Sequence, residues 1–199
     1  MPAATVTSTQ AGWHGKLPAA GDFVNGGARL ELITAIERWA MAGMVEIRAA
    51  GGPSIDAFLT APLFRLATGP GIFGAAPGLA VLGPGMDRSG RPYPFVIAMP
   101  LCTPAAPKEV LRENRALFEA LEAVFLAALA PDYPLDRLAE DLAGLPAPLS
   151  ATGAHAAAET AVIEANGTPV LQLRTPPTPA QFAALFRAGP SIAAGGTAA

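Results

Sequence analysis

Apolar residues recur along the chain at spacings that predict helices and strands in an irregular alternation. Over residues 28–48 they return every three or four positions, which predicts an amphipathic helix. Trp39 falls on the apolar side of this helix and should be buried. The same periodicity predicts the longest helix over residues 107–130 and a shorter one over 135–142, which Gly144 ends.

Strands are expected where apolar runs are short. Residues 79–82 and 95–101 have strand length, and Trp13 to Phe23 predicts a short strand followed by an ordered turn. Asn166-Gly167 separates two further apolar runs and is a strong hairpin signal. Since helices and antiparallel-type strands mix without a strict βαβ order, the pattern predicts the α+β class. The expected fold is a single compact domain with a mainly antiparallel sheet flanked by helices.

Charge and cysteine content exclude several classes of protein. The 13 basic and 16 acidic side chains give a net charge of −3, which argues against nucleic-acid binding. The single Cys102 cannot form an internal disulfide and fits a reducing compartment, where it is expected to be a small buried hydrophobe. Residues 66–86 carry no charge, but their many glycines and prolines argue against a membrane span. With no secretory signal visible, a cytoplasmic protein is expected.

Signatures for cofactors and metals fail on context. Residues 69–74 match the dinucleotide fingerprint, but no long helix or suitably placed acid follows them. Gly15-Lys16 lacks the first glycine and the Ser/Thr of a P-loop, so Lys16 is expected to be a surface charge or partner contact. His14 and His155 have no neighbours at metal-ligand spacing, and His14 is expected to be a satisfied strand residue. No cofactor, metal or catalytic residue is therefore expected.

One loop concentrates charge in apolar surroundings. Asp87, Arg88, Arg91 and Tyr93 lie in a connection that is long for a hairpin. One interpretation is a structural turn, in which Asp87 caps its own backbone and pairs with Arg91. The other is a recognition loop whose arginine and tyrosine bind a partner, so that replacing them changes binding more than folding. Both interpretations remain open, and they are compatible.

Three segments together resemble a known family. They are residues 15–23 (GKLPAAGDF), residues 59–66 (LTAPLFRL) and residues 87–94 (DRSGRPYP). In this order they are similar to the motifs of the TagF (ImpM) family of bacterial type VI secretion systems. The chain departs from the family pattern at Ala20, where arginine is usual, and at Phe64, where tryptophan is usual.

The resemblance implies a function and partners. TagF proteins are post-translational repressors of type VI secretion that act in the cytoplasm and are linked to a forkhead-associated scaffold protein. The expected partners are therefore type VI secretion proteins, and neither nucleic-acid binding nor membrane insertion is expected. The hypothesis for the partner-binding site takes its residues from the first and third segments: Lys16, Asp22, Asp87, Arg88, Arg91 and Tyr93.

The resemblance also divides the chain. Residues 12–145 are expected to form a TagF-like domain, with residues 146–190 as a hairpin–helix extension packed on it. Residues 1–11 and 191–199 are expected to be disordered. Two other functions remain open. One is a small hydrolase or transferase with a site around Asp87 and Arg91, in which His14 or Cys102 is a further candidate. The other is a structural subunit of the secretion apparatus.

Overall fold

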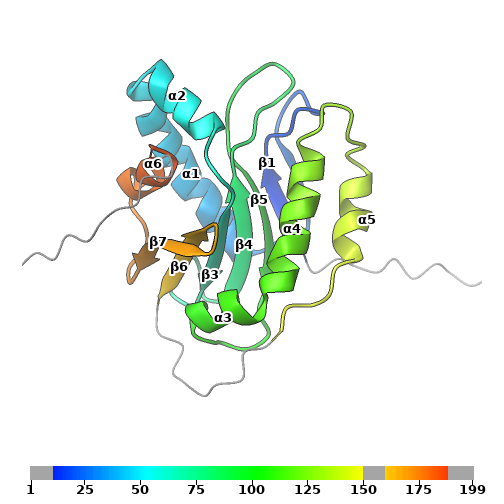
Figure 1. The fold of residues 1–199 in the computed structure, drawn as a ribbon, viewed down its shortest axis with the longest axis vertical. Coiled ribbons are helices and arrows are strands. Elements are labelled where there is room, and N and C mark those ends of the chain that lie inside the picture. Colours follow the sequence, from blue (N-terminus) through cyan, green and yellow to red (C-terminus); the bar gives the residue numbers. More distant parts are fainter. Residues whose placement is uncertain (1–10, 150–159, 188–199) are drawn as a thin grey trace, which may run out of the picture.

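A seven-stranded sheet lies between two groups of helices in the computed structural model, which describes residues 11–149 and 160–187 (Figure 1). Every strand pairs antiparallel with its neighbours, in the order β2-β1-β5-β4-β3-β6-β7. The strands are β1 (Gly12–Gly15), β2 (Val24–Gly27), β3 (Phe64–Thr68), β4 (Gly78–Gly83), β5 (Phe95–Pro100), β6 (Ala161–Ala165) and β7 (Thr168–Leu173). This arrangement confirms the predicted α+β class.

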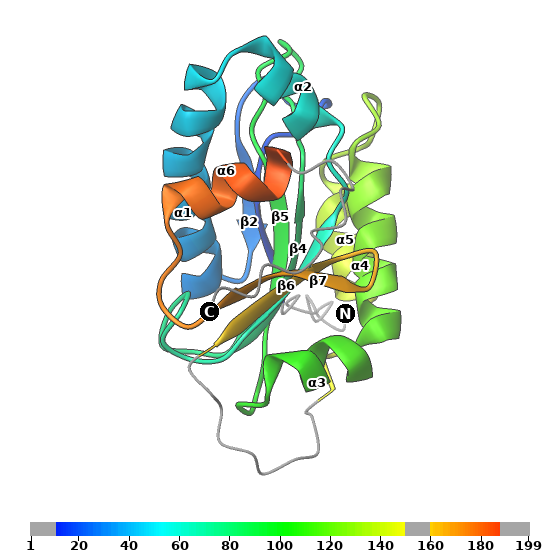
Figure 2. The same ribbon diagram turned by 60° about the vertical axis from the view of Figure 1, so that its left-hand side comes forward.

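The helices divide between the two faces of the sheet (Figure 2). One face is covered by α1 (Glu31–Ala49), α2 (Gly52–Leu59) and α6 (Pro179–Arg187). The other face is covered by α3 (Pro107–Glu113), α4 (Arg115–Ala128) and α5 (Arg137–Ala143). Each group buries its own hydrophobic cluster against the sheet, so the domain has two apolar cores.

Alternation along the strands distributes side chains between these cores. In β3, Phe64 and Leu66 are buried with the α1 group, whereas Ala67 is buried with the α4 group. Arg65 has the parity of Ala67 and therefore faces α4. It lies opposite Glu164 of β6, so one ion pair is built into the sheet register.

Several elements follow the sequence pattern closely. The amphipathic helix is α1, and Trp39 on its inner side is only 5% exposed, as predicted. The predicted hairpin is β6–β7, with positive φ at both Asn166 and Gly167, as its turn type requires. The β4 and β5 strands lie where short apolar runs predicted them.

The long helix predicted over residues 107–130 is wrong, because Asn114 divides it into α3 and α4. Asn114 is 1% exposed, and its side-chain amide donates to the carbonyls of Val110 and Leu149 at 3.0 and 3.2 Å. Its Oδ1 accepts from the Leu149 amide at 2.7 Å. The side chain thus shares the Val110 carbonyl with the Asn114 backbone amide and ties this point of the chain to Leu149.

The C-terminal elements complete the domain. Two strands, β6 and β7, extend the sheet beyond β3, and α6 packs on α1 in the same apolar core. The disorder predicted for residues 1–11 and 191–199 concerns residues outside the described part of the chain, apart from the buried Ala11. Within residues 11–149 and 160–187, none of the helices combines the length and the apolar character needed to cross a membrane.

Candidate functional site

Two segments far apart in sequence meet at the upper end of the molecule in Figure 1. One is residues 15–23, which begin at the last residue of β1, and the other is the loop between β4 and β5. The amide of Arg88 donates to the Ala20 carbonyl at 2.7 Å, and Arg88 Nη2 donates to the Ala19 carbonyl. Arg91 Nη2 donates to the Gly21 carbonyl at 2.7 Å. The loop is therefore fastened along the first segment.

The carboxylate of Asp87 is the centre of this junction. Its Oδ2 accepts from Lys16 Nζ at 2.8 Å and from Arg91 Nε at 2.7 Å. Its Oδ1 accepts from the backbone amides of Ser89 and Arg91 at 2.9 and 3.0 Å. The turn in which Asp87 caps its own backbone and pairs with Arg91 is thus confirmed.

The junction is buried, which contradicts the expectation that Lys16 is a surface charge. Lys16 is 6% exposed and Asp87 only 1%. Burial alone would raise the pKa of Asp87, but the hydrogen bonds from Lys16 and from Arg91 and Ser89 outweigh it. The pKa of Asp87 therefore lies well below its usual range, and Lys16 serves to neutralise the ionised carboxylate inside the protein.

Glycines permit the close approach of the two segments. Gly15 has a φ of 137°, and a Cβ at this position would lie 2.2 Å from the Pro94 carbonyl oxygen. A Cβ on Gly85 would lie 2.4 Å from the Lys16 carbonyl oxygen. Any side chain at either position would force the segments apart.

A stack of aromatic rings covers the buried ions. The Phe23 ring stacks on His14 at 5.3 Å between centroids and meets Tyr93 edge to face at 4.8 Å. Lys16 Nζ lies 5.0 Å from the centre of the same ring. Despite these contacts Phe23 is 43% exposed. One side of its ring thus packs on buried residues, while the other side faces solvent.

Tyr93 belongs to the core rather than to the surface of this loop. It is 6% exposed, and its hydroxyl donates to the Glu37 carbonyl at 3.3 Å. Burial, with a further contribution from the charge of Glu37, raises the pKa of Tyr93 to about 12. Replacing Tyr93 would therefore disturb folding as well as binding, contrary to the expectation from sequence.

Neither His14 nor Cys102 is among the hydrogen-bond or ion-pair partners of Asp87 in the described residues. His14 lies in β1, as expected for a strand residue, but its Nε2 lies 3.5 Å from Glu37 Oε1 without a hydrogen bond, so the expectation that its side chain is satisfied is wrong for this nitrogen. Cys102 is exposed rather than buried, because it follows β5 instead of lying inside it. In the described part of the chain, no three His, Cys, Asp or Glu side chains are close enough to hold a metal ion.

Comparison with known proteins identifies the family. A family model described as the TagF N-terminal domain, type VI secretion system-associated, matches residues 12–145. The chain belongs to the TagF family. The resemblance seen in the sequence motifs is thus confirmed, and this TagF-family chain is associated with type VI secretion.

A solved structure resembles this TagF-family chain over most of its length. The crystal structure of PA0076 from Pseudomonas aeruginosa PAO1 has a TM-score of 0.77 and 23% sequence identity. The similarity covers 95% of the present chain and all of the other. At this identity it supports the α+β fold alone. A search of curated protein sequences finds no match.

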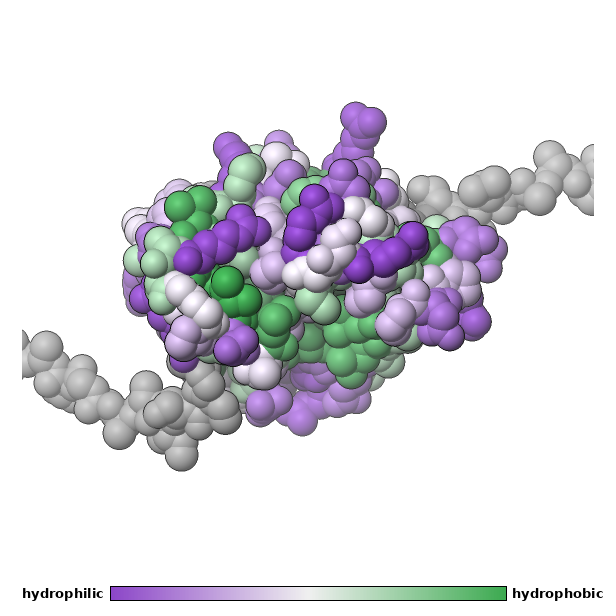
Figure 3. Space-filling view, turned by 90° about the horizontal axis from the view of Figure 1, so that it is seen from above, coloured by the Kyte–Doolittle hydropathy of each residue, from purple (hydrophilic) through white to green (hydrophobic). Residues whose placement is uncertain are grey.

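The residues of the TagF hypothesis separate into two groups. Lys16, Asp87 and Tyr93 are buried, and they form the base of the site. Asp22, Arg88 and Arg91 reach solvent. Together with the exposed Phe23, which the hypothesis did not include, we call them the platform. The partner-binding hypothesis from the sequence did not include Phe23. Its position as an aromatic residue at the end of a rigid glycine-rich turn could have indicated a binding residue. Seen from this end, the molecule presents hydrophilic side chains beside hydrophobic surface (Figure 3).

Proposed function

We propose that this chain is a cytoplasmic post-translational repressor of type VI secretion assembly that acts by binding a protein partner. Membership of the TagF family supports the link to type VI secretion. The platform supports the mode of action, since an exposed aromatic residue flanked by arginines is typical of binding hot spots. The proposed partner is a type VI secretion protein, with a forkhead-associated scaffold protein as the first candidate.

The single observation that carries this proposal is the exposure of Phe23 on a rigid base. A phenylalanine ring that is 43% exposed contributes little to folding through its outer surface. The ring is already immobilised by His14 and Tyr93, so a partner would lose little side-chain entropy when it covers Phe23. The charges of Asp22 and Arg91 at its edge would select the partner.

The chemistry of Asp87 favours binding over catalysis. Both of its carboxylate oxygens already accept hydrogen bonds from within the chain. A carboxylate so engaged and with a lowered pKa is a poor proton acceptor for a substrate. Cavities of about 660 and 430 Å³ lie elsewhere, and neither is lined by Asp87, Arg91, His14 or Cys102. We therefore propose a role without catalysis.

Overproduction in a host with an active type VI system tests the proposal. Excess wild-type chain should lower the amount of secreted type VI substrate several-fold compared with an empty vector. Phe23→Ala should not lower secretion, whereas Met41→Ala should act as the wild type does. Met41 is a matched control because it is 54% exposed and lies on α1, outside the platform.

Two outcomes would contradict the proposal. Secretion that is unchanged or raised by excess wild-type chain would exclude a repressor. Stoichiometric recovery of the chain in the purified secretion apparatus, together with unchanged secretion, would instead indicate a structural subunit. Thermal melting of each variant ensures that a lost effect reflects lost binding rather than lost folding.

A further inference from the structure

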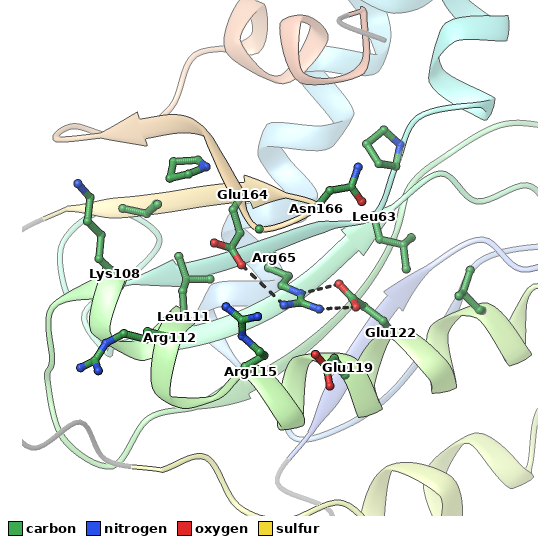
Figure 4. A pocket seen from close by; sticks show the side chains of 15 residues that line it. Leu63, Arg65, Lys108, Leu111, Arg112, Arg115, Glu119, Glu122, Glu164 and Asn166 are labelled. Atoms are coloured by element: carbon green, nitrogen blue, oxygen red, sulfur yellow. Dashed lines mark hydrogen bonds and ion pairs between the residues drawn. The ribbon is translucent and has the colours of Figure 1, made fainter. Parts of the chain in front are cut away.

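The third motif segment, residues 59–66, is not used by the platform and leads to a different surface. Pro62, Leu63 and Arg65 of this segment line a groove of about 660 Å³ (Figure 4). One wall of the groove is formed by α3 and α4, and the other by the β6–β7 hairpin. None of the platform residues contributes to its lining. The groove is therefore a separate candidate site.

The floor of the groove is prearranged around Arg65. Arg65 Nε and Nη2 each donate to the Glu122 carboxylate at 2.7 Å, and Nη1 lies 3.8 Å from Glu164 Oε1. The guanidinium carbon also lies 5.6 Å from the centre of the Phe118 ring. The hydrogen bonds to Glu122 raise the pKa of Arg65 despite its partial burial. Arg65 and the two carboxylates hold one another in place, which gives the floor a fixed shape, and with one cation against two carboxylates the floor itself does not attract an anion.

The strands that form the floor of the groove offer no free edge for backbone pairing. The strands of the floor, β3 and β6, pair with each other, and each has its other edge occupied by β4 or β7. Within the described residues β7 keeps one unpaired edge, but the strands of the floor are paired on both sides, so the floor can contact a ligand only through side chains.

One end of the groove is positively charged. Lys108, Arg112 and Arg115 lie at spacings of four and three residues along α3 and the start of α4, and all are exposed. Arg112 pairs only with its neighbour Glu113, and Lys108 and Arg115 form no ion pair with any described residue. The groove lining carries four cations and three carboxylates, although the whole chain has a net charge of −3. This end of the groove is thus positively charged, whereas the net charge of the whole chain is negative.

The other end of the groove is apolar. It is lined by Pro62, Leu63 and Leu126, and Leu126 is 57% exposed. Arg115 and Leu126 lie eleven residues apart on α4, which corresponds to about 16 Å along the helix axis. An extended chain covers that distance in about five residues.

We propose that this groove binds an extended acidic segment of a partner protein. Acidic side chains of the segment pair with Lys108, Arg112 and Arg115. An apolar side chain about five residues away packs on Leu63 and Leu126. Charge complementarity at one end and burial of exposed leucine at the other favour this occupant.

A labelled peptide with a leucine about five residues from a run of glutamates tests the proposal by fluorescence anisotropy. The wild-type chain should bind it saturably. Lys108→Glu with Arg115→Glu should weaken binding at least tenfold, and Leu126→Ala should weaken it several-fold. The control is Arg174→Glu with Arg187→Glu, which makes the same change in net charge at exposed positions outside the groove. The control should bind within about twofold of the wild type.

Four results would overturn the proposal. The first is the absence of saturable binding at millimolar peptide. The second is equal weakening by the control pair, which would mean that only net charge matters. The third is equal binding of a peptide whose leucine is replaced by serine. The fourth is that the chain binds anionic lipid vesicles but not the peptide, and that Lys108→Glu with Arg115→Glu abolishes the lipid binding, which would assign the groove to a membrane surface.

Discussion

Lys16 Nζ lies 2.8 Å from Asp87 Oδ2, and both side chains are almost completely buried. The two residues are 71 positions apart in sequence. Their ion pair therefore joins the segment after β1 to the loop between β4 and β5, and it fixes the base on which Phe23 rests. The stability of this base determines whether the platform keeps its shape.

Removing the charge of Lys16 should weaken the fold. Lys16→Met leaves the buried carboxylate of Asp87 with one cation fewer, so we expect the melting temperature to fall by roughly 6–12 °C. Lys108→Met is the matched control, because Lys108 is exposed and forms no ion pair with any described residue. This variant should have a melting temperature close to that of the wild type. Equal melting temperatures for the two variants would show that the buried pair is energetically unimportant.

The ionised state of Asp87 should make stability depend on pH. Its folded-state pKa is lowered, so its stabilising effect is complete above the unfolded-state pKa of about 4 and declines as the pH falls towards the folded value. Urea unfolding should therefore find the wild type more stable than Asp87→Asn at neutral pH. The difference should shrink progressively below about pH 4. A difference that stays constant down to about pH 2.5 would contradict the lowered pKa.

Trp39 should be essential for attaching α6 to α1. Its indole Nε1 donates to the Thr178 carbonyl at 2.6 Å, and its ring meets Phe182 edge to face at 5.0 Å. Trp39→Ala should lower the free energy of unfolding by about 3–5 kcal/mol. The exposed neighbour provides the control, and Arg38→Ala should change this free energy by less than about 0.5 kcal/mol. Similar chemical denaturation curves for both variants would show that the contact with α6 is dispensable.

Replacement by alanine should destabilise the fold at one glycine of this segment and be tolerated at another. Gly15→Ala combines a φ of 137° with a Cβ 2.2 Å from the Pro94 carbonyl oxygen, and it should destabilise the fold by more than about 2 kcal/mol. Nothing lies within 4 Å of a Cβ built on Gly21, so Gly21→Ala should be tolerated. Denaturant titration of both variants measures the effect. A well-folded Gly15→Ala would mean that the two segments do not pack as closely as described.

Local pattern was sufficient to predict the elements whose signal lies within a few residues. The amphipathic face of α1, the Asn166-Gly167 turn and the turn at Asp87 are of this kind. The start of α6 has a similarly local cause, since Thr178 just before it and Gln181 exchange side-chain hydrogen bonds with each other's backbone amide.

Features that depend on distant partners could not be predicted in this way. Asn114 breaks a helical pattern because its side chain finds Leu149, which lies 35 residues away. Lys16 is buried because Asp87 neutralises it from another loop. Nothing local marked the start of β3 at Phe64, just before the uncharged run of residues 66–86. The platform itself required the fold, because only tertiary packing decides that Phe23 is exposed while Tyr93 is not.

The most direct test of the account is calorimetric titration of the purified chain with the forkhead-associated scaffold protein of the same secretion system. The account predicts saturable binding by the wild type and by Met41→Ala. Phe23→Ala should bind at least tenfold more weakly, a loss of about 1.4 kcal/mol, without a large change in melting temperature. Equal affinity of Phe23→Ala and the wild type would contradict the claim that the platform is the binding surface. Absence of any binding by the wild type would contradict the proposed partner.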